Sequence, residues 1–164
     1  MVKSDKIEIC DATTSDAGSL RALAVSCRID AWSVSDYAEE ISRLDSIVVK
    51  ALSEGRLVGF AVSRSVPGQA GGFEVDLYNL AVESDFRRKG TGGLILDRVV
   101  TAALKKGATD IWLEVRESNA AAISFYKRHG FVAEATRTNF YSNPRENAVI
   151  MRLSISSQRD NSGA

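Results

Sequence analysis

Apolar residues recur along the chain with two different periods. Runs with an apolar residue at every second position, or with several in succession, predict strands. Such runs cover residues 7–10, 46–52, 57–65, 73–82, 110–116, 131–135 and 149–154. The pair Glu54-Gly55 separates the second and third of these runs and predicts a tight hairpin turn, whereas residues 67–72 predict a looser one.

Four other segments carry apolar residues three and four positions apart, which is typical of helices. The first segment includes Leu20 to Cys27 and follows possible N-cap residues at 14–16. The second begins with a capping box at Ser33 and ends at about Leu44. The third follows a glycine-rich turn and ends near Gly107, and the fourth spans residues 119–129. The order β-α-α-β-β-β-α-β-α-β-β predicts a single mixed α/β domain over residues 1–154 and a polar, disordered tail over 155–164.

The segment from 75 to 116 reads strand, helix, strand, so its two strands should be parallel neighbours. Its first strand runs into a basic, glycine-rich turn. Glycines let the backbone approach a ligand closely, and the first amides of the helix point outward together at the positive end of its dipole. A turn of this kind favours phosphate or pyrophosphate. Its residues are Arg87, Arg88, Lys89, Gly90, Thr91, Gly92 and Gly93.

Nucleotide-binding motifs do not match this turn. A P-loop needs GxxxxGK[ST], but no Lys-Ser or Lys-Thr pair follows these glycines. The dinucleotide motif GxGxxG also fails, because Ile95 takes its last position counted from Gly90. The remaining pattern, R-x-x-G-x-G, resembles the acyl-coenzyme A pyrophosphate loop of the GNAT superfamily of N-acetyltransferases; an ordinary basic turn is the alternative interpretation. The resemblance implies a GNAT fold whose parallel strand pair splays apart to hold acyl-coenzyme A. It also implies that the strand residues Leu80, Ala81 and Val82 dock the pantetheine arm.

A second informative segment, residues 112–131, reads WLEVRESNAAAISFYKRHGF. Ser118 or Asn119 predicts a helix cap, and Gly130 predicts a left-handed end. The segment closely resembles the bacterial ribosomal-protein-alanine N-acetyltransferases (RimI-type), which carry LEVR-x-SN-x-AA-x-x-x-Y-x-x-x-GF. Asn119 and Tyr126 share a helical face about 10 Å apart along the axis, so one can contact the coenzyme arm while the other reaches its sulfur end.

The resemblance implies Glu114 as general base, Tyr126 as general acid and Asn119 as a coenzyme contact. Acetyl transfer from a thioester needs a neutral amine and a proton for the leaving thiolate. Near pH 7.5 roughly a quarter of N-terminal amines are neutral, against ~0.1% of lysines, so a carboxylate acting through water suffices for an α-amine. We expect burial to strengthen Glu114 as a base and Tyr126 to keep its proton. Backbone amides at 80–82 would polarise the carbonyl.

Each of these residues also has a purely structural interpretation. Glu114 alternates with Arg116 on its strand and could form a surface ion pair with it. Tyr126 could be a half-buried core aromatic, and Asn119 no more than a cap. His129, the only histidine, is expected to interact with the carbonyls at the end of its helix. The joint occurrence of Glu114, Asn119 and Tyr126 at family spacing favours function.

Residues 137–151, RTNFYSNPRENAVIM, resemble the family segment R-x-N-Y-Y-P…E-D-A-x-I-M, which lies beside the incoming peptide. The resemblance implies Tyr141 and Trp32 as acceptor contacts. This chain departs from the pattern, because Phe140 replaces a tyrosine, Pro144 is displaced, and Asn147 stands where an aspartate is usual. A proline that usually precedes Trp32 is also missing. These changes concern the choice of acceptor and leave acetyl transfer unaffected.

Composition narrows the classes further. The 164 residues include 21 basic and 21 acidic side chains, so no global field would draw the protein to nucleic acid or to an anionic membrane. Cys10, Cys27 and His129 lack the spacing of a metal site, so we expect no metal. The start of the chain has no apolar signal core, which favours the cytoplasm. Nothing predicts a defined oligomer, so we expect a monomer or a weak dimer.

Three hypotheses follow. The leading one is an acetyl-coenzyme A-dependent enzyme that acetylates a protein N-terminal α-amine, the N-terminal alanine of a small-subunit ribosomal protein. The second is a related enzyme acting on a small-molecule amine or a protein lysine. The third, a non-catalytic acyl-coenzyme A-binding module, predicts loss of Glu114 or Tyr126, and both are present. A peptide acceptor predicts an open groove beside Tyr141 and Trp32, whereas a small amine predicts a closed, acidic pocket.

Overall fold

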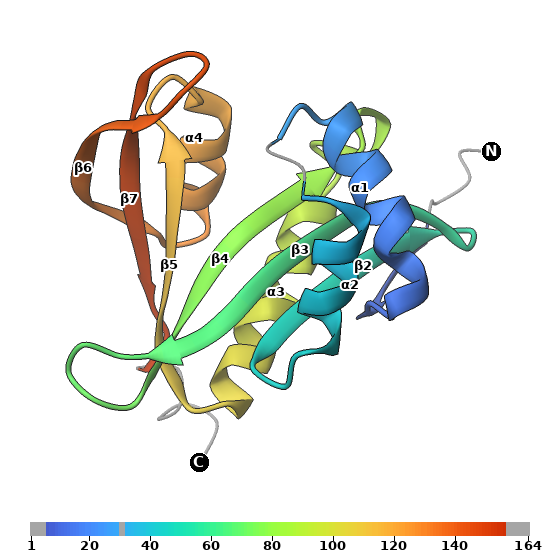
Figure 1. Ribbon diagram of the computed structural model, residues 1–164, viewed down its shortest axis with the longest axis horizontal. Coiled ribbons are helices and arrows are strands. Elements are labelled where there is room, and N and C mark those ends of the chain that lie inside the picture. The colour runs from blue at the N-terminus through green and yellow to red at the C-terminus, as the bar shows by residue number, and fades with distance from the viewer. Residues whose placement is uncertain (1–5, 30–31, 157–164) are drawn as a thin grey trace. The chain divides into compact units, whose positions relative to one another are not determined.

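The computed structural model describes residues 6–29 and 32–156 of the chain (Figure 1). Within this part the helices and strands follow the predicted order. They are β1 (Ile7–Asp11), α1 (Ala17–Ser26), α2 (Val34–Ser42), β2 (Ser46–Ser53), β3 (Arg56–Pro67), β4 (Phe73–Val82), α3 (Thr91–Lys105), β5 (Ala108–Arg116), α4 (Ala120–Arg128), β6 (Val132–Tyr141) and β7 (Glu146–Ser154). Short 3₁₀ turns, η1 (Thr14–Asp16) and η2 (Ser84–Phe86), precede α1 and α3.

The strands form a mixed sheet with the hydrogen-bonded order β1-β2-β3-β4-β5-β7-β6. The pairs β1–β2, β2–β3, β5–β7 and β6–β7 are antiparallel, and β4–β5 is parallel. The parallel pair confirms the crossover predicted between residues 75 and 116. Its register runs from Phe73 opposite Ala108 to Leu77 opposite Leu113 and stops before either strand ends, as expected of a splayed pair.

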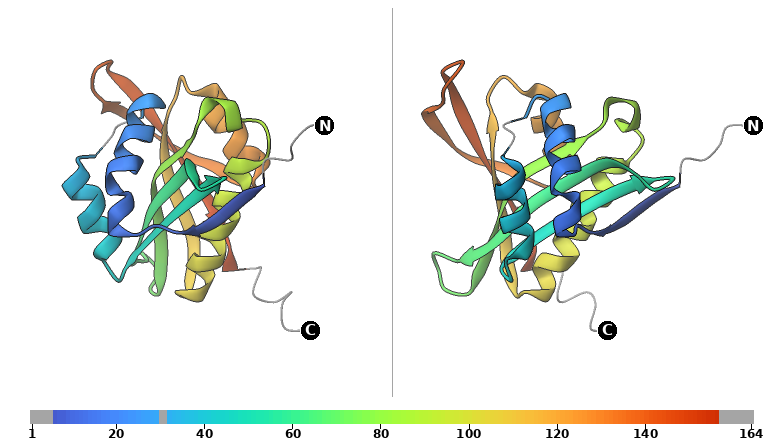
Figure 2. Two further views of the ribbon diagram at one scale, coloured as in Figure 1. Left: turned by 90° about the vertical axis from the view of Figure 1, so that its right-hand side faces the viewer. Right: turned by 45° about the vertical axis from the view of Figure 1, so that its right-hand side comes forward.

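The chain divides into two compact units, residues 1–64 with 79–102 and residues 65–78 with 103–164. In the first unit, α1 and α2 lie on one face of β2 and β3, and most of α3 lies on the other (Figures 1 and 2). The core of this unit includes Leu20, Tyr37 and Phe60, which are fully buried. Trp32 packs against that core from its edge.

In the second unit, α4 packs beside β5 and β7 (Figure 2). The Asn119 side chain caps α4 by accepting a hydrogen bond from the amide of Ala122 at 3.1 Å. At the other end Gly130 has φ 91°, and the amides of Gly130 and Phe131 donate to the carbonyls of residues 127 and 126. This is a Schellman motif, so both predicted ends of the helix are confirmed. His129 bonds the carbonyl of Phe125 through Nδ1, as expected.

Several boundaries differ from the prediction. Helix α2 ends at Ser42, and Leu44 is 95% exposed. Strand β6 continues to Tyr141, where the prediction stopped at residue 135, because its exposed, largely polar residues carry no apolar signal. Ile155, predicted to lie in the disordered tail, is fully buried and its amide donates to the carbonyl of Thr109 at 2.8 Å. Residues 157–164 of that tail lie outside the described residues.

Among the described residues, no helix is both long and apolar enough to cross a membrane. No group of three or more His, Cys, Asp and Glu side chains in this part of the chain could hold a metal ion, and Cys10 and Cys27 are free thiols.

Candidate active site

The basic glycine turn has the backbone that its sequence predicts. Arg88 and Gly90 have positive φ angles of 58° and 84°, and no atom lies within 4 Å of the place that a Cβ at Gly90 would take. Helix α3 begins at Thr91, so the amides of Thr91, Gly92 and Gly93 belong to its first turn, where an α-helix supplies no acceptor of its own. These amides can therefore bind an anion at the positive end of the helix dipole.

Side chains around the turn fix it and leave one polar group unsatisfied. Arg87 folds back and donates from Nε to the carbonyl of Val82 at 2.8 Å, which ties the turn to the end of β4. The ammonium of Lys89 lies 5.4 Å from the centre of the Phe86 ring. Thr91 is only 1% exposed, and its Oγ1 has no hydrogen-bond partner among the described residues. Because an unpaired buried hydroxyl is costly, Thr91 marks a place where a ligand atom would be accommodated.

Glu114 differs from its prediction in two respects. Its side chain is 34% exposed instead of buried, and its ion-pair partner is Arg137 instead of Arg116, with Arg137 Nη1 donating to Oε1 at 2.9 Å. The sheet register explains the partner. Glu114 on β5 lies opposite Ile150 on β7, and the stretch of β6 that ends at Arg137 runs alongside, so the guanidinium of Arg137 reaches across β7.

A cavity of about 450 Å³ lies beside Glu114, within the second unit. Its lining comes from the end of β3, the loop after it, and strands β4 to β7. The lining residues are Val66, Pro67, Gln69, Glu74, Asp76, Leu77, Tyr78, Trp112, Leu113, Glu114, Arg137 and Ile150. Neither Tyr141 nor Trp32 belongs to it, and sequence reasoning missed it. The available signal was the alternation that places Glu74 and Asp76 on one face of β4, and Trp112 and Glu114 on one face of β5.

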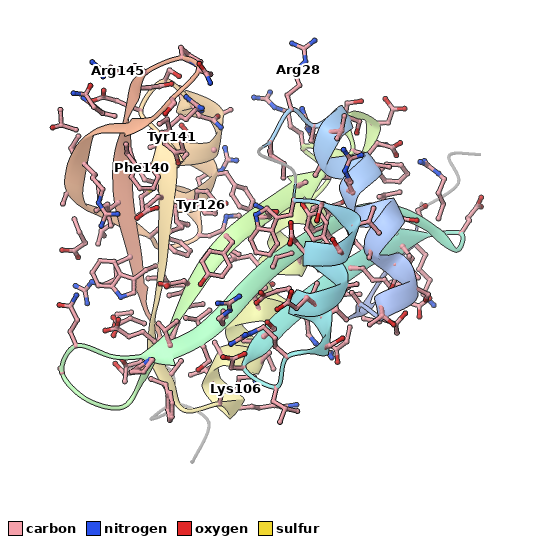
Figure 3. The ribbon with its side chains drawn as sticks, in the orientation of Figure 1. Arg28, Lys106, Tyr126, Phe140, Tyr141 and Arg145 are labelled. Carbon is pink, nitrogen blue, oxygen red and sulfur yellow. The ribbon has the colours of Figure 1, made fainter. Side chains whose placement is uncertain are left out.

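Tyr126 is buried, and its ring meets those of Phe125 and Phe131 edge-on at 5.2 and 5.3 Å. Burial, assisted by the nearby Tyr141, raises the pKa of Tyr126 far above its ordinary value. The hydroxyl therefore keeps its proton at every pH at which the protein works, as a general acid must. Figure 3 shows Tyr126 on α4 together with Tyr141 and Phe140 at the end of β6.

Arg116 organises the end of the second unit. Its guanidinium lies 4.3 Å from the centre of the Tyr141 ring, and it donates to Glu146 at 3.3 Å and to the carbonyl of Pro144 at 3.1 Å. Glu146 in turn accepts the amide of Ser118. The bonds from Ser118, with a smaller effect of Arg116, hold the pKa of Glu146 below its usual value. The loop before α4 is thereby fixed to the β6–β7 hairpin that carries Tyr141.

Asn147, which replaces the usual aspartate, is matched to a neighbour in this chain. Its Oδ1 accepts the amide of Asn139 at 3.0 Å, while its Nδ2 donates to the carboxylate of Glu117 at 3.2 Å. An aspartate can only accept, so it would keep the first bond and lose the second. It would also place a second negative charge beside Glu117. The departure from the family pattern thus has a local physical reason.

We expect Asn147→Asp to lower the free energy of unfolding by about 1 kcal/mol, since it removes a hydrogen bond and opposes two like charges. Urea unfolding followed by circular dichroism measures the change. Glu117→Gln in the same background should recover most of the loss, because the side-chain amide introduced at position 117 can donate to the new carboxylate. Equal stability of the single variant and the original protein would contradict the pairing.

Trp32 has a clear structural role. Its ring stacks on that of Tyr37 with centres 5.5 Å apart, and the hydroxyl of Tyr37 donates to Asn79 Oδ1 at 2.9 Å. Trp32 is thus anchored to the core of the first unit, and its contact with an acceptor stays a prediction. Residue 31, where the family has proline, lies outside the described residues.

The comparison with known families decides the class of the protein. The model of the Acetyltransferase (GNAT) family matches residues 18–131, a span that includes the glycine turn, Glu114, Asn119 and Tyr126. The chain belongs to the GNAT family. The GNAT fold and the N-acetyltransferase activity predicted from the sequence are therefore confirmed. The roles of the individual site residues stay predictions. The glycine turn belongs to the first unit. The second unit contains Glu114, Asn119, Tyr126 and Tyr141.

Relatives within the GNAT family confirm the closer resemblance. The chain is 39% identical over 104 residues to the [ribosomal protein bS18]-alanine N-acetyltransferase of Escherichia coli K12, covering 62% of this chain and 67% of the relative. The protein of the same name from Salmonella typhimurium is 37% identical over 110 residues, or 66% of this chain and 71% of the relative. The crystal structure of the ribosomal-protein-S18-alanine N-acetyltransferase from Escherichia coli superimposes with a TM-score of 0.80 at 31% identity, covering 92% of this chain and 95% of that one.

Proposed function

We propose that this GNAT enzyme transfers an acetyl group from acetyl-coenzyme A to the N-terminal α-amine of a protein. The proposed acceptor is the N-terminal alanine of the small-subunit ribosomal protein bS18. The proposal rests mainly on the sequence of residues 112–131, which follows the pattern of the ribosomal-protein-alanine enzymes without a break. This segment folds into a strand and a helix with both expected caps. The 39% identity to an enzyme named for this reaction supports the acceptor.

The glycine turn fits the pyrophosphate of acetyl-coenzyme A, which supplies the acetyl group as an activated thioester. The first-turn amides of Thr91, Gly92 and Gly93 and the cations Arg88 and Lys89 would bind the phosphates. The unpaired Oγ1 of Thr91 fits the same ligand. Further along, the backbone at 80–82 would receive the pantetheine amides. Capping uses only the Oδ1 of Asn119, so its Nδ2 can donate to the coenzyme.

Glu114 is the proposed base. The acceptor nitrogen attacks the carbonyl carbon of the thioester, and the carbon–sulfur bond breaks. Glu114 takes the proton of the acceptor amine, directly or through water, and its 34% exposure leaves room for such a water. Arg137 donates to Glu114 Oε1 at 2.9 Å and orients the carboxylate. An exposed carboxylate is a weak base, and it suffices here because an α-amine loses its proton far more readily than a lysine.

Tyr126 is the proposed acid and gives its hydroxyl proton to the leaving thiolate. Its raised pKa ensures that the proton is present, and the free thiol formed on the coenzyme carries it away. The packing of its ring between Phe125 and Phe131 fixes the direction of the hydroxyl. Precise placement of the donor contributes to the rate because it removes the need to order the group during the reaction.

One observation favours a second candidate function, the acetylation of a small cationic amine. The cavity beside Glu114 carries the carboxylates of Glu74 and Asp76, which suit a polyamine. We rank this below the α-amine of a protein, because the identity to the ribosomal-protein enzymes extends over most of the chain.

Transfer of labelled acetyl from acetyl-coenzyme A to three kinds of acceptor tests the proposed function. The acceptors are peptides with a free N-terminal alanine, peptides blocked at the N-terminus that contain lysine, and polyamines. We expect label on the first kind only. Label confined to the blocked peptides, or to the polyamines, would contradict the proposal and identify the true acceptor class.

A further inference from the structure

Arg116, the last residue of β5, binds the turn between β6 and β7. Its Nη1 donates to the carbonyl of Pro144 at 3.1 Å, and its Nη2 donates to the carbonyl of Ser142 at 3.4 Å. Nη1 also donates to the carboxylate of Glu146 at 3.3 Å. The planar guanidinium presents several donors in fixed directions, whereas the ammonium of a lysine concentrates its three donors on one atom. A single arginine therefore holds both sides of the turn.

The same guanidinium also holds an aromatic ring. Its carbon Cζ lies 4.3 Å from the centre of the ring of Tyr141, the last residue of β6. Tyr141 pairs with Glu146 across the hairpin. A cation over an aromatic face attracts the ring. Since the donors of Arg116 are bonded to the turn while Tyr141 lies against its face, the position of the ring follows from that of the guanidinium.

The turn is also tied to the start of α4. Glu146 accepts the amide of Ser118, and the amide of Glu117 donates to the carbonyl of Asn147 at 3.1 Å. The Nδ2 of Asn147 returns a hydrogen bond to the Glu117 carboxylate at 3.2 Å. Helix α4 carries Tyr126, the proposed acid. The turn that Arg116 organises is thus connected to the helix that bears the proposed acid.

We propose that Arg116 is a positioning residue for the acceptor, because it holds the ring of Tyr141 where that ring contacts the polypeptide whose α-amine is acetylated. This inference rests on the proposed function and on the acceptor contact expected of Tyr141. Arg116 acts through Tyr141 and not on the coenzyme. Its loss should therefore weaken the binding of the acceptor and leave the affinity for acetyl-coenzyme A and the chemical step unchanged.

Variants of Arg116 should still fold. Ser142 and Pro144, whose carbonyls it binds, are exposed, so water can replace the hydrogen bonds to them. The pairing of β6 with β7 over residues 132–137 does not depend on the Arg116 side chain. What the variants lose is the fixed position of the Tyr141 ring. A contact that is loosely held must be ordered when the acceptor binds, and this ordering lowers the affinity.

Steady-state kinetics with a peptide that begins with alanine test this inference. For Arg116→Met, we expect the KM for the peptide to rise roughly tenfold and kcat to change less than about twofold. For Arg116→Lys, we expect a rise in KM of about threefold, because the charge stays while the planar fork is lost. Calorimetric titration should give the original affinity for coenzyme A with both variants. Circular dichroism at the assay temperature verifies folding, and Arg116→Lys decides the question if Arg116→Met does not fold.

A double-mutant cycle shows whether Arg116 acts through Tyr141. Tyr141→Ala should itself raise the KM for the peptide, and Arg116→Met in that background should then change KM less than about twofold. Arg152→Lys is the matched control. Arg152 also lies over a ring, that of Trp112 at 5.6 Å, and binds two carboxylates, but it lies near the other end of β7. This control should leave the KM for the peptide within about twofold of the original value.

The outcomes separate this inference from the proposed function. An unchanged KM for Arg116→Met and Arg116→Lys, with the α-amine acetylated normally, would overturn the positioning role and leave the function standing. A rise in KM that is equally large in the Tyr141→Ala background would also overturn it, as would a loss confined to kcat. If the original protein acetylates no α-amine peptide, the proposed function itself fails before any variant is compared.

Discussion

Glu114→Gln should lower kcat by about 10²- to 10³-fold, because general-base catalysis contributes that much and an amide cannot take up the proton. Glutamine keeps the size of the side chain and can still accept the hydrogen bond that Arg137 now donates to Glu114. The fold and the affinity for acetyl-coenzyme A should therefore be nearly unchanged. Single-turnover rates give the chemical step, and calorimetric titration with coenzyme A gives the binding.

Two variants sharpen this result. Tyr126→Phe should cause a loss of similar order through the missing proton donor, and the phenylalanine fits the same contacts with Phe125 and Phe131. Glu134→Gln removes a carboxylate of the same sheet that is bound to Arg152, and it should change kcat less than twofold. A Glu114→Gln enzyme with the original rate would show that the base lies elsewhere.

Glu40→Gln should lower the free energy of unfolding by about 2–4 kcal/mol, because it breaks a buried ion pair. Glu40 is 3% exposed, and its carboxylate is bound by the guanidinium of Arg64 and the hydroxyl of Ser46. The variant removes the carboxylate that binds the guanidinium of Arg64, which is 32% exposed. Urea unfolding measures the loss, and Asp45→Asn, in a pair with Arg43 that is about 40% exposed on both sides, should cost less than 1 kcal/mol.

The same variant has a signature in acid. Burial raises the pKa of Glu40, but the bonds from Arg64 and Ser46 outweigh it and hold the pKa below its usual value. A carboxyl whose pKa is lowered by folding adds stability above its unfolded pKa of about 4.3, and this stability is lost as the pH falls through the folded value. The stability gap between the original protein and Glu40→Gln should therefore be widest near neutral pH and close in acid. A gap independent of pH would exclude an ionised Glu40.

The parts of the fold that could be predicted are those with an apolar period or a special backbone position. Asn119 and Gly130 delimit α4 as their chemistry requires, and the turn at Glu54-Gly55 has the two positive φ angles, 48° and 80°, of a tight hairpin. Strand β6 could not be delimited, since an exposed edge strand needs no apolar face. Leu44 extended the predicted α2 because it is apolar, but its side chain is 95% exposed.

Within the candidate site, the sequence could not predict which residues the side chains touch. Glu114 was expected to be buried or to pair with Arg116, its neighbour on the same strand. Its actual partner, Arg137, comes from β6 across an intervening strand, and pairing of that kind depends on register.

The sequence also contained an unused signal for the buried ion pair of Glu40. Tyr37, Glu40 and Ile41 share a helical face at i, i+3 and i+4, which places a charge in an apolar stripe and indicates a buried ion pair.

The position of the transferred acetyl group on a single peptide tests the central claim most directly. The peptide begins with a free alanine and contains one lysine further on, and tandem mass spectrometry locates the acetyl group after incubation with the enzyme and acetyl-coenzyme A. The account predicts acetylation of the alanine α-nitrogen, with the lysine Nζ unmodified. Acetyl found only on the lysine would contradict it.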